Sequence, residues 1–108
     1  MTKKQFLKLF DLISNDEERD EFLKDERIKP ERRLHSRCDM NAFLLLDSLS
    51  TRKAGKRMDI VCRADYDEIW LEITPGDVAK NATEEDIADL IRCGVRMDDD
   101  DETFCMFV

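Results

Sequence analysis

The sequence predicts a small α+β domain, and three observations support this prediction. Apolar residues recur at helical spacing in the first half of the chain. Two short runs in the second half alternate apolar and polar residues, which is typical of half-buried strands. The length, 108 residues, suits one compact domain. We therefore expect a single α+β domain over residues 1–108. It should have three N-terminal helices, a β-hairpin, a fourth helix, and a C-terminal strand or hairpin that completes a small antiparallel sheet packed by helices.

Two helices are predicted before the first proline. Thr2 is suited to cap the first helix, because its hydroxyl can accept a backbone N–H of the first turn. The apolar positions of this helix follow the i, i+3, i+4, i+7 pattern and are Phe6, Leu9, Phe10 and Ile13. Polar residues 14–17 interrupt the pattern with the spacing of a capping box. A second, heavily charged helix is expected to follow and to run to about residue 27.

A third helix is predicted over residues 31–50. Pro30 disfavours helix in the residue before it and suits the first turn of the helix that follows. The apolar stripe has steps of four, four, three and four residues and consists of Leu34, Cys38, Ala42, Leu45 and Leu49. Residues 39–41 offer a break, since Asp is a good N-cap, but the stripe keeps its phase across them. The stripe predicts a buried Cys38.

Two short strands are predicted over residues 58–64 and 68–74, after a glycine-containing basic loop over residues 51–57. Alternation places Cys62 on the apolar face of the first strand. In the second strand it turns Trp70 away from the apolar neighbours. Trp70 is therefore either covered by helices or left as an exposed anchor for a partner.

The last helix has signals at both ends. Thr83 is a suitable N-cap, and three acidic residues follow it at the positive end of the helix. Gly94 stands where a C′ glycine ends a helix. Residues 75–76, Pro-Gly, are predicted as a turn before this helix. Residues 95–108 are predicted as a closing hairpin around the acidic run 98–102.

The charge of the chain is unevenly distributed. Eighteen Lys and Arg and twenty-six Asp and Glu give a formal net charge of −8, which disfavours non-specific wrapping of nucleic acid. Residues 1–57 carry fourteen basic and eleven acidic side chains, a net of +3. Residues 58–108 carry four basic and fifteen acidic side chains, a net of −11. Either the two halves neutralise each other within the fold, or the acidic half presents a negative surface to a partner.

We expect a non-enzymatic binding protein with an acidic contact surface. A surface of this kind favours a basic partner surface, such as the nucleic-acid-binding channel of another protein, which it would occlude. Small acidic domains without motifs are typical of inhibitors and accessory factors of phages and other mobile elements. Exposed aromatic residues would supply the buried anchors of the contact. The predicted contact residues are Asp65, Tyr66, Asp67, Glu68, Trp70, Asp86, Asp89, Asp98, Asp99, Asp100, Asp101 and Glu102.

Two other binding functions stay open. The basic face of one copy could meet the acidic face of the next and build a homo-oligomer. Direct nucleic-acid binding would instead use Arg32, Arg33, Arg37 and the basic residues 52–57. The net charge makes this second alternative the weaker one.

Metal binding is a further alternative with little support. His35 and Cys38 are three residues apart and would be neighbours on a helix. The other three cysteines, Cys62, Cys93 and Cys105, complete a zinc site only if the fold gathers them, and no CxxC pair is present. The acidic run lacks the glycine and the final glutamate of an EF-hand loop. We predict no metal site and no cofactor.

Catalysis is also not indicated. The chain has one histidine, no glycine-rich phosphate loop, no Gly-x-Ser-x-Gly elbow and no His-Glu-x-x-His pair. The longest apolar run, residues 42–46, is too short for a membrane span, and the N-terminus lacks the pattern of a signal peptide. We therefore expect a cytoplasmic protein with free, mostly buried thiols.

Overall fold

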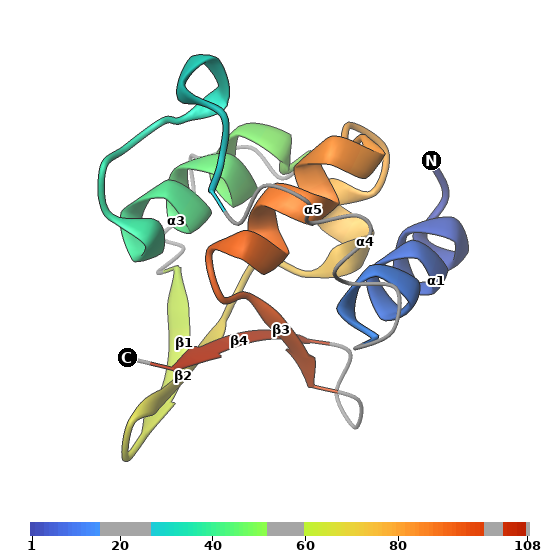
Figure 1. Cartoon of the computed structure of the whole chain (residues 1–108). Coiled ribbons are helices and arrows are strands. Elements are labelled where there is room, and N and C mark those ends of the chain that lie inside the picture. Colours follow the sequence, from blue (N-terminus) through green and yellow to red (C-terminus); the bar gives the residue numbers. More distant parts are fainter. Residues whose placement is uncertain (16–26, 52–59, 99–102, 108) are drawn as a thin grey trace.

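The computed structural model describes residues 1–15, 27–51, 60–98 and 103–107, and it confirms the α+β class. Within these residues, four α-helices pack on a four-stranded antiparallel sheet (Figure 1). The elements are α1 (Lys3–Ser14), a 3₁₀ turn η1 (Pro30–Arg32), α3 (Cys38–Leu49), β1 (Val61–Asp65), β2 (Glu68–Leu71), α4 (Pro75–Val78), α5 (Glu84–Arg92), β3 (Arg96–Asp98) and β4 (Thr103–Phe107).

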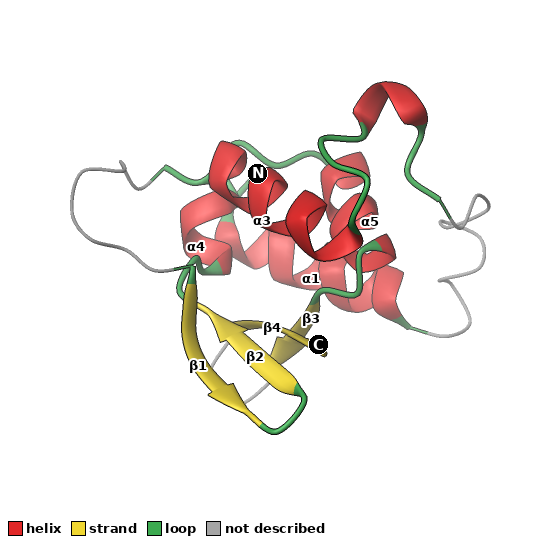
Figure 2. Ribbon diagram, turned by 90° about the vertical axis from the view of Figure 1, so that its left-hand side faces the viewer, coloured by secondary structure: helices red, strands yellow, loops and turns green. Residues whose placement is uncertain are grey.

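The sheet has the order β1-β2-β4-β3, so the last strand of the chain lies inside the sheet, between β2 and β3. All three pairings are antiparallel. The helices form a layer on one side of the sheet, and the β1–β2 hairpin extends away from that layer (Figure 2). The opposite, outer face of the sheet has no described helix over it.

The core lies between the helices and the inner face of the sheet. The rings of Phe6 and Phe10 on α1 contact Phe104 of β4, with centroid distances of 5.9 and 6.0 Å. Ile87 and Leu90 of α5 are fully buried beside them. Burying each such side chain contributes roughly 1.5–3 kcal/mol to stability, so this contact holds α1 and α5 on the sheet.

The predicted caps of α1 and α5 are confirmed. Thr2 and Gln5 form a capping box at the start of α1, and Thr83 and Asp86 form one at the start of α5. Gly94 has a φ of 87° and ends α5. Its N–H donates to the carbonyl of Ile91 and the N–H of Val95 to that of Leu90, both at 3.0 Å. This pair of bonds is a Schellman motif, which a glycine in the left-handed conformation permits.

The prediction of one helix over residues 31–50 is wrong. The chain leaves helical geometry after Arg32 and enters α3 only at Cys38. The buried side chain of Asn41 explains the interruption, because its Oδ1 accepts the N–H groups of Leu34 at 2.7 Å and His35 at 3.0 Å. A side-chain acceptor for these two amides replaces the helical carbonyls that they would otherwise bond.

Because the helix begins later than predicted, only part of the predicted apolar stripe is buried. Leu34 is 49% exposed and Cys38 is exposed at the start of α3. Leu46, rather than Leu45, is fully buried. The remaining two positions of the stripe are buried as predicted, because they lie within the part of α3 that faces α5 and α4.

The second half of the chain shows two further differences. Residues 75–78 form the short helix α4 where a turn was predicted, with a capping box at Thr74 and Asp77. Cys62 is exposed, not buried, because all five residues of the edge strand β1 are exposed and neither face of the strand is covered by the described residues. The predicted second helix, the basic loop and the acidic residues 99–102 lie outside the described residues.

Candidate partner-binding surface

The tip of the β1–β2 hairpin is the most exposed part of the described acidic half. Asp65 pairs with Glu68 in the sheet, so only Tyr66 and Asp67 form the loop. Tyr66 is 100% exposed and has a φ of 53°. Asp65 and Asp67 are exposed on either side of it. The hairpin therefore presents an aromatic ring between two carboxylates.

The outer face of the sheet continues this surface. Strand register places Arg63 of β1 beside Trp70 of β2, and the Arg63 guanidinium lies 4.0 Å from the centre of the Trp70 ring. On the other side, Trp70 Nε1 donates to the Asp98 carboxylate of β3 at 2.9 Å. Cation–π contact and hydrogen bond together fix the indole flat on the face. Trp70 is thus half-buried by its own neighbours, not covered by helices.

A second cluster lies next to the first. Arg96 of β3 forms an ion pair with Glu68 of β2, and its guanidinium lies 3.9 Å from the ring centre of Phe107. Phe107 itself is 62% exposed. Beneath these side chains, burial raises the pKa of the Cys105 thiol to about 11, although the charge of Arg96 acts in the opposite direction. The outer face is therefore a mixed layer of aromatic rings, arginines and carboxylates.

Not all of the predicted contact residues reach this surface. Asp65, Tyr66, Asp67, Glu68, Trp70 and Asp98 lie on the hairpin and the outer face, whereas Asp86 and Asp89 lie on α5, in the helical layer. Asp89 is only 1% exposed. Asp86 and Asp89 thus lie apart from the hairpin and the outer face. Asp99, Asp100, Asp101 and Glu102 lie outside the described residues.

Asp86 and Asp89 instead neutralise arginines inside the fold. Arg32 donates to Asp89 and to Asp86, each at 2.8 Å, and Arg92 donates to Asp89 at 2.7 Å. Arg92 also contacts Glu85 at 3.3 Å. The hydrogen bond to Asp89 raises the pKa of Arg32, so its charge is held over the whole accessible pH range. This network holds the segment around η1 against α5. In it, Arg32 from the basic half of the chain neutralises carboxylates of the acidic half, as one of the two interpretations of the charge distribution expects.

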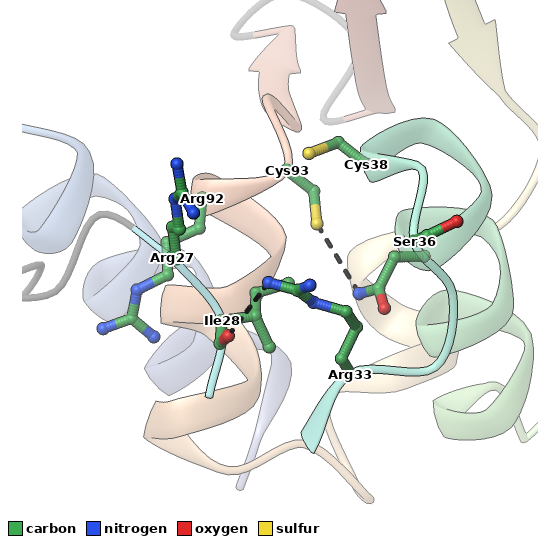
Figure 3. Close-up of a pocket in the computed structure, with 8 residues that line it drawn as sticks. Arg27, Ile28, Arg33, Ser36, Cys38, Arg92 and Cys93 are labelled. Atoms are coloured by element: carbon green, nitrogen blue, oxygen red, sulfur yellow. Dashed lines mark hydrogen bonds between the residues drawn. The ribbon is translucent and has the colours of Figure 1, made fainter. Parts of the chain in front are cut away.

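Sequence reasoning missed Asn41, which organises the other side of the same segment. Besides accepting the two backbone N–H groups, its Nδ2 donates to Cys93 Sγ at 3.6 Å (Figure 3). Burial raises the pKa of the Cys93 thiol to about 11, although the hydrogen bond from Asn41 acts in the opposite direction. The only signal in the sequence is that the amide side chain of Asn41 stands directly before the apolar run 42–46. A polar residue at such a place has to find buried partners.

The structure also bears on metals and membranes. Within the described residues, no group of three or more His, Cys, Asp or Glu side chains is placed to hold a metal ion. His35 Nδ1 instead accepts the N–H of Arg37 at 3.0 Å. No helix in the described part of the chain is long and apolar enough to cross a membrane. Comparisons with protein-family models, curated proteins and solved structures find no match to the chain.

Proposed function

We propose that this chain is a non-enzymatic binding protein that docks its β1–β2 hairpin and outer sheet face onto a basic surface of a partner protein. The partner surface is one that binds nucleic acid, and the docked chain occludes it. The function is that of an inhibitor or accessory factor of the kind carried by phages and other mobile elements. The observation that carries the proposal is Tyr66, fully exposed in a left-handed conformation between two aspartates.

The charges of the hairpin support a basic partner. Neither Asp65 nor Asp67 forms an ion pair with a described cation, so both carboxylates are available at the tip. The outer face of the sheet carries two further carboxylates, Glu68 and Asp98, together with the two arginines Arg63 and Arg96. Exposed charges of one sign steer a partner of the other sign and accelerate association, with a strong dependence on salt.

The aromatic residues supply the contact that charge alone does not give. Tyr66 and Phe107 are exposed, and Arg63 and Asp98 hold Trp70 half-buried on the outer face. Interface energies concentrate on a few aromatic and arginine anchors, which are surrounded by polar contacts that exclude water. In a phosphate-binding groove of the partner, the carboxylates of the chain would occupy the positions that bind phosphates. The rings of Tyr66, Trp70 and Phe107 would fill the apolar pockets of that groove.

Affinity measurements with matched variants test the proposal. The partner is first captured from the native host, identified by mass spectrometry and purified. We expect Tyr66→Ala to weaken the complex by about 30-fold, because truncating an interface anchor costs ~2 kcal/mol or more. Asp65→Lys/Asp67→Lys should lower the association rate and reduce its dependence on salt. Nucleic acid bound by the partner should compete with the chain.

The control variant is Asp11→Lys/Asp47→Lys. It changes the net charge by the same amount as Asp65→Lys/Asp67→Lys, but at exposed positions on α1 and α3. Its affinity should fall far less than that of the hairpin variant. Equal losses in both double variants, or simultaneous binding of chain and nucleic acid to the partner, would refute the docking surface.

The edge of the sheet favours a second candidate, self-assembly. All five residues of β1 are exposed, and β1 has only β2 as a described neighbour in the sheet. An uncovered edge strand can pair with the same strand of a second copy. Light scattering at low and high salt separates the two candidates. An oligomer supports self-assembly, and its persistence at high salt assigns it to backbone pairing through β1, whereas its loss at high salt assigns it to contact between opposite charges. A monomer at both salt concentrations supports the hetero-complex.

A further inference from the structure

A basic pocket lies in the helical layer (Figure 3). It has a volume of about 290 Å³ and is formed by the segment around η1, the first turn of α3 and the end of α5. Three arginines line it, together with one serine hydroxyl and two thiols. The lining residues are Arg27, Ile28, Arg33, Ser36, Cys38, Asn41, Arg92 and Cys93.

The positive charge of the pocket is only partly balanced. Arg92 is bound by Asp89 at 2.7 Å and by Glu85 at 3.3 Å. Asp89 also serves Arg32, so the carboxylates of α5 are already engaged. Neither Arg27 nor Arg33 forms an ion pair with a carboxylate of the described residues. To the described residues, the Arg33 guanidinium donates one hydrogen bond, a long contact of 3.5 Å to the carbonyl of Ile28.

Neutral donors line the same pocket, with Ser36 on the side of Arg33 opposite to Arg27 (Figure 3). α3 begins at Cys38 without a side-chain cap, so the first amides of the helix have no acceptor from an N-cap side chain. The Asp39 carboxylate turns to the N–H of Met40 at 2.8 Å and does not line the pocket. The Ser36 hydroxyl lines the pocket next to this helix start. Two guanidinium groups without a carboxylate partner among the described residues, a hydroxyl, and the remaining first-turn amides of Cys38 and Asp39 together suit an anion with several acceptor oxygens.

We propose that this pocket binds one tetrahedral oxyanion, either free phosphate or the phosphoryl group of a small molecule. Arg33 and Arg27 supply the charge, and Ser36 and the first turn of α3 supply further donors. Arginine is suited to this task because its planar fork donates two parallel hydrogen bonds to phosphate oxygens. The volume is at the lower end of the range for small-molecule sites, so the ligand is a small phosphomonoester or the bare ion.

The exposed thiol of Cys38 reports on occupancy. Cys38 lines the pocket, whereas Cys62, equally exposed, lies on β1 in the sheet. An anion in the pocket shields Cys38 and disfavours its thiolate, which is the reactive form. We therefore expect inorganic phosphate to slow alkylation of Cys38 by iodoacetamide about fivefold or more, with Cys62 unchanged. Chloride at the same ionic strength should leave both rates unchanged.

Two variants connect the effect with the pocket. Arg33→Gln should weaken phosphate binding about tenfold, measured by calorimetry, because it removes a charge-assisted hydrogen bond. Arg63→Gln is the matched control, since it removes an exposed arginine from β1 and should leave phosphate affinity unchanged. Circular dichroism checks that both variants are folded. One phosphate per chain is the expected stoichiometry.

The source of the phosphoryl group is distinguished by a second titration with glycerol phosphate. Tighter binding of glycerol phosphate than of phosphate assigns the pocket to a phosphomonoester, and weaker binding assigns it to the free ion. The proposal fails if neither compound protects Cys38 at millimolar concentration. It also fails if Arg33→Gln keeps full protection, or if Cys62 is protected to the same extent.

Discussion

Tyr66 is a bulky aromatic residue that is fully exposed and adopts a left-handed backbone conformation. Its φ of 53° is a conformation that glycine and asparagine adopt readily and that costs a bulky residue roughly 1–2 kcal/mol. Its ring is fully exposed and so gains nothing from burial. A strained, exposed aromatic residue does not contribute to the stability of its own fold. Strain of this kind is typical of functional sites, and a contact with a partner accounts for it.

The first prediction concerns Tyr66→Gly. Glycine removes the strain, although its larger freedom in the unfolded chain offsets part of the gain. We expect the free energy of unfolding to rise by about 1 kcal/mol, measured by urea denaturation, while affinity for the partner falls. Tyr66→Ala is the control, because it keeps the strain and removes only the ring. A Tyr66→Gly variant that is less stable than Tyr66→Ala would contradict the strain argument.

The elements were predictable where their signals are local. The caps of α1 and α5 are specified by residues within one turn, Thr2 with Gln5 and Thr83 with Asp86, and both helices are confirmed. The hairpin was equally local, because alternation and a short polar loop fix it. The start of α3 was predicted seven residues too early, at residue 31 and not at Cys38, since its true start depends on Asn41 bonding residues six and seven positions earlier. Helix propensities of the residues do not indicate such a hydrogen bond between a side chain and distant backbone amides.

The second prediction tests Asn41 as the organiser of that segment. In Asn41→Ala the N–H groups of Leu34 and His35 lose their acceptor, and we expect a loss of about 2 kcal/mol in unfolding free energy. Hydrogen exchange should show faster exchange of these two amides in particular. Asn81→Ala is the matched control, because Asn81 donates one bond to the carbonyl of Leu49 from an exposed position. It should cost less than 1 kcal/mol, in line with the ordinary net value of one hydrogen bond.

At the scale of the whole molecule, the charge split was predictable but its consequence was not. The sequence predicts a basic first half and an acidic second half. It does not show that Arg32 crosses from one half to the other and neutralises Asp86 and Asp89. Such pairs depend on tertiary contacts between residues more than fifty positions apart. The described part of the predicted contact surface is therefore narrower than the sequence predicts, because those of its carboxylates that stay accessible lie on the hairpin and the sheet.

The third prediction concerns stability at alkaline pH. Cys93 in the helical layer and Cys105 in the sheet have ordinary thiol pKa values of 9.0 when exposed, and burial raises each pKa to about 11 in the fold. Between these values the unfolded chain has released both protons and the folded chain still holds them. Stability contributed by the neutral thiols is therefore complete below pH 9 and is lost as pH rises toward 11.

Urea denaturation at pH 8, 9, 10 and 11 measures this slope. We expect the two thiols together to contribute a loss on the order of 5 kcal/mol by pH 11, since each pKa is raised from 9.0 to about 11 and one unit of pKa corresponds to ~1.4 kcal/mol. Cys93→Ala/Cys105→Ala should lower stability at every pH but flatten the slope. Cys38→Ala/Cys62→Ala, which changes the two exposed thiols, should keep the slope of the wild type. Slopes that are equal in the two double variants would show that the buried thiols do not couple alkaline pH to unfolding.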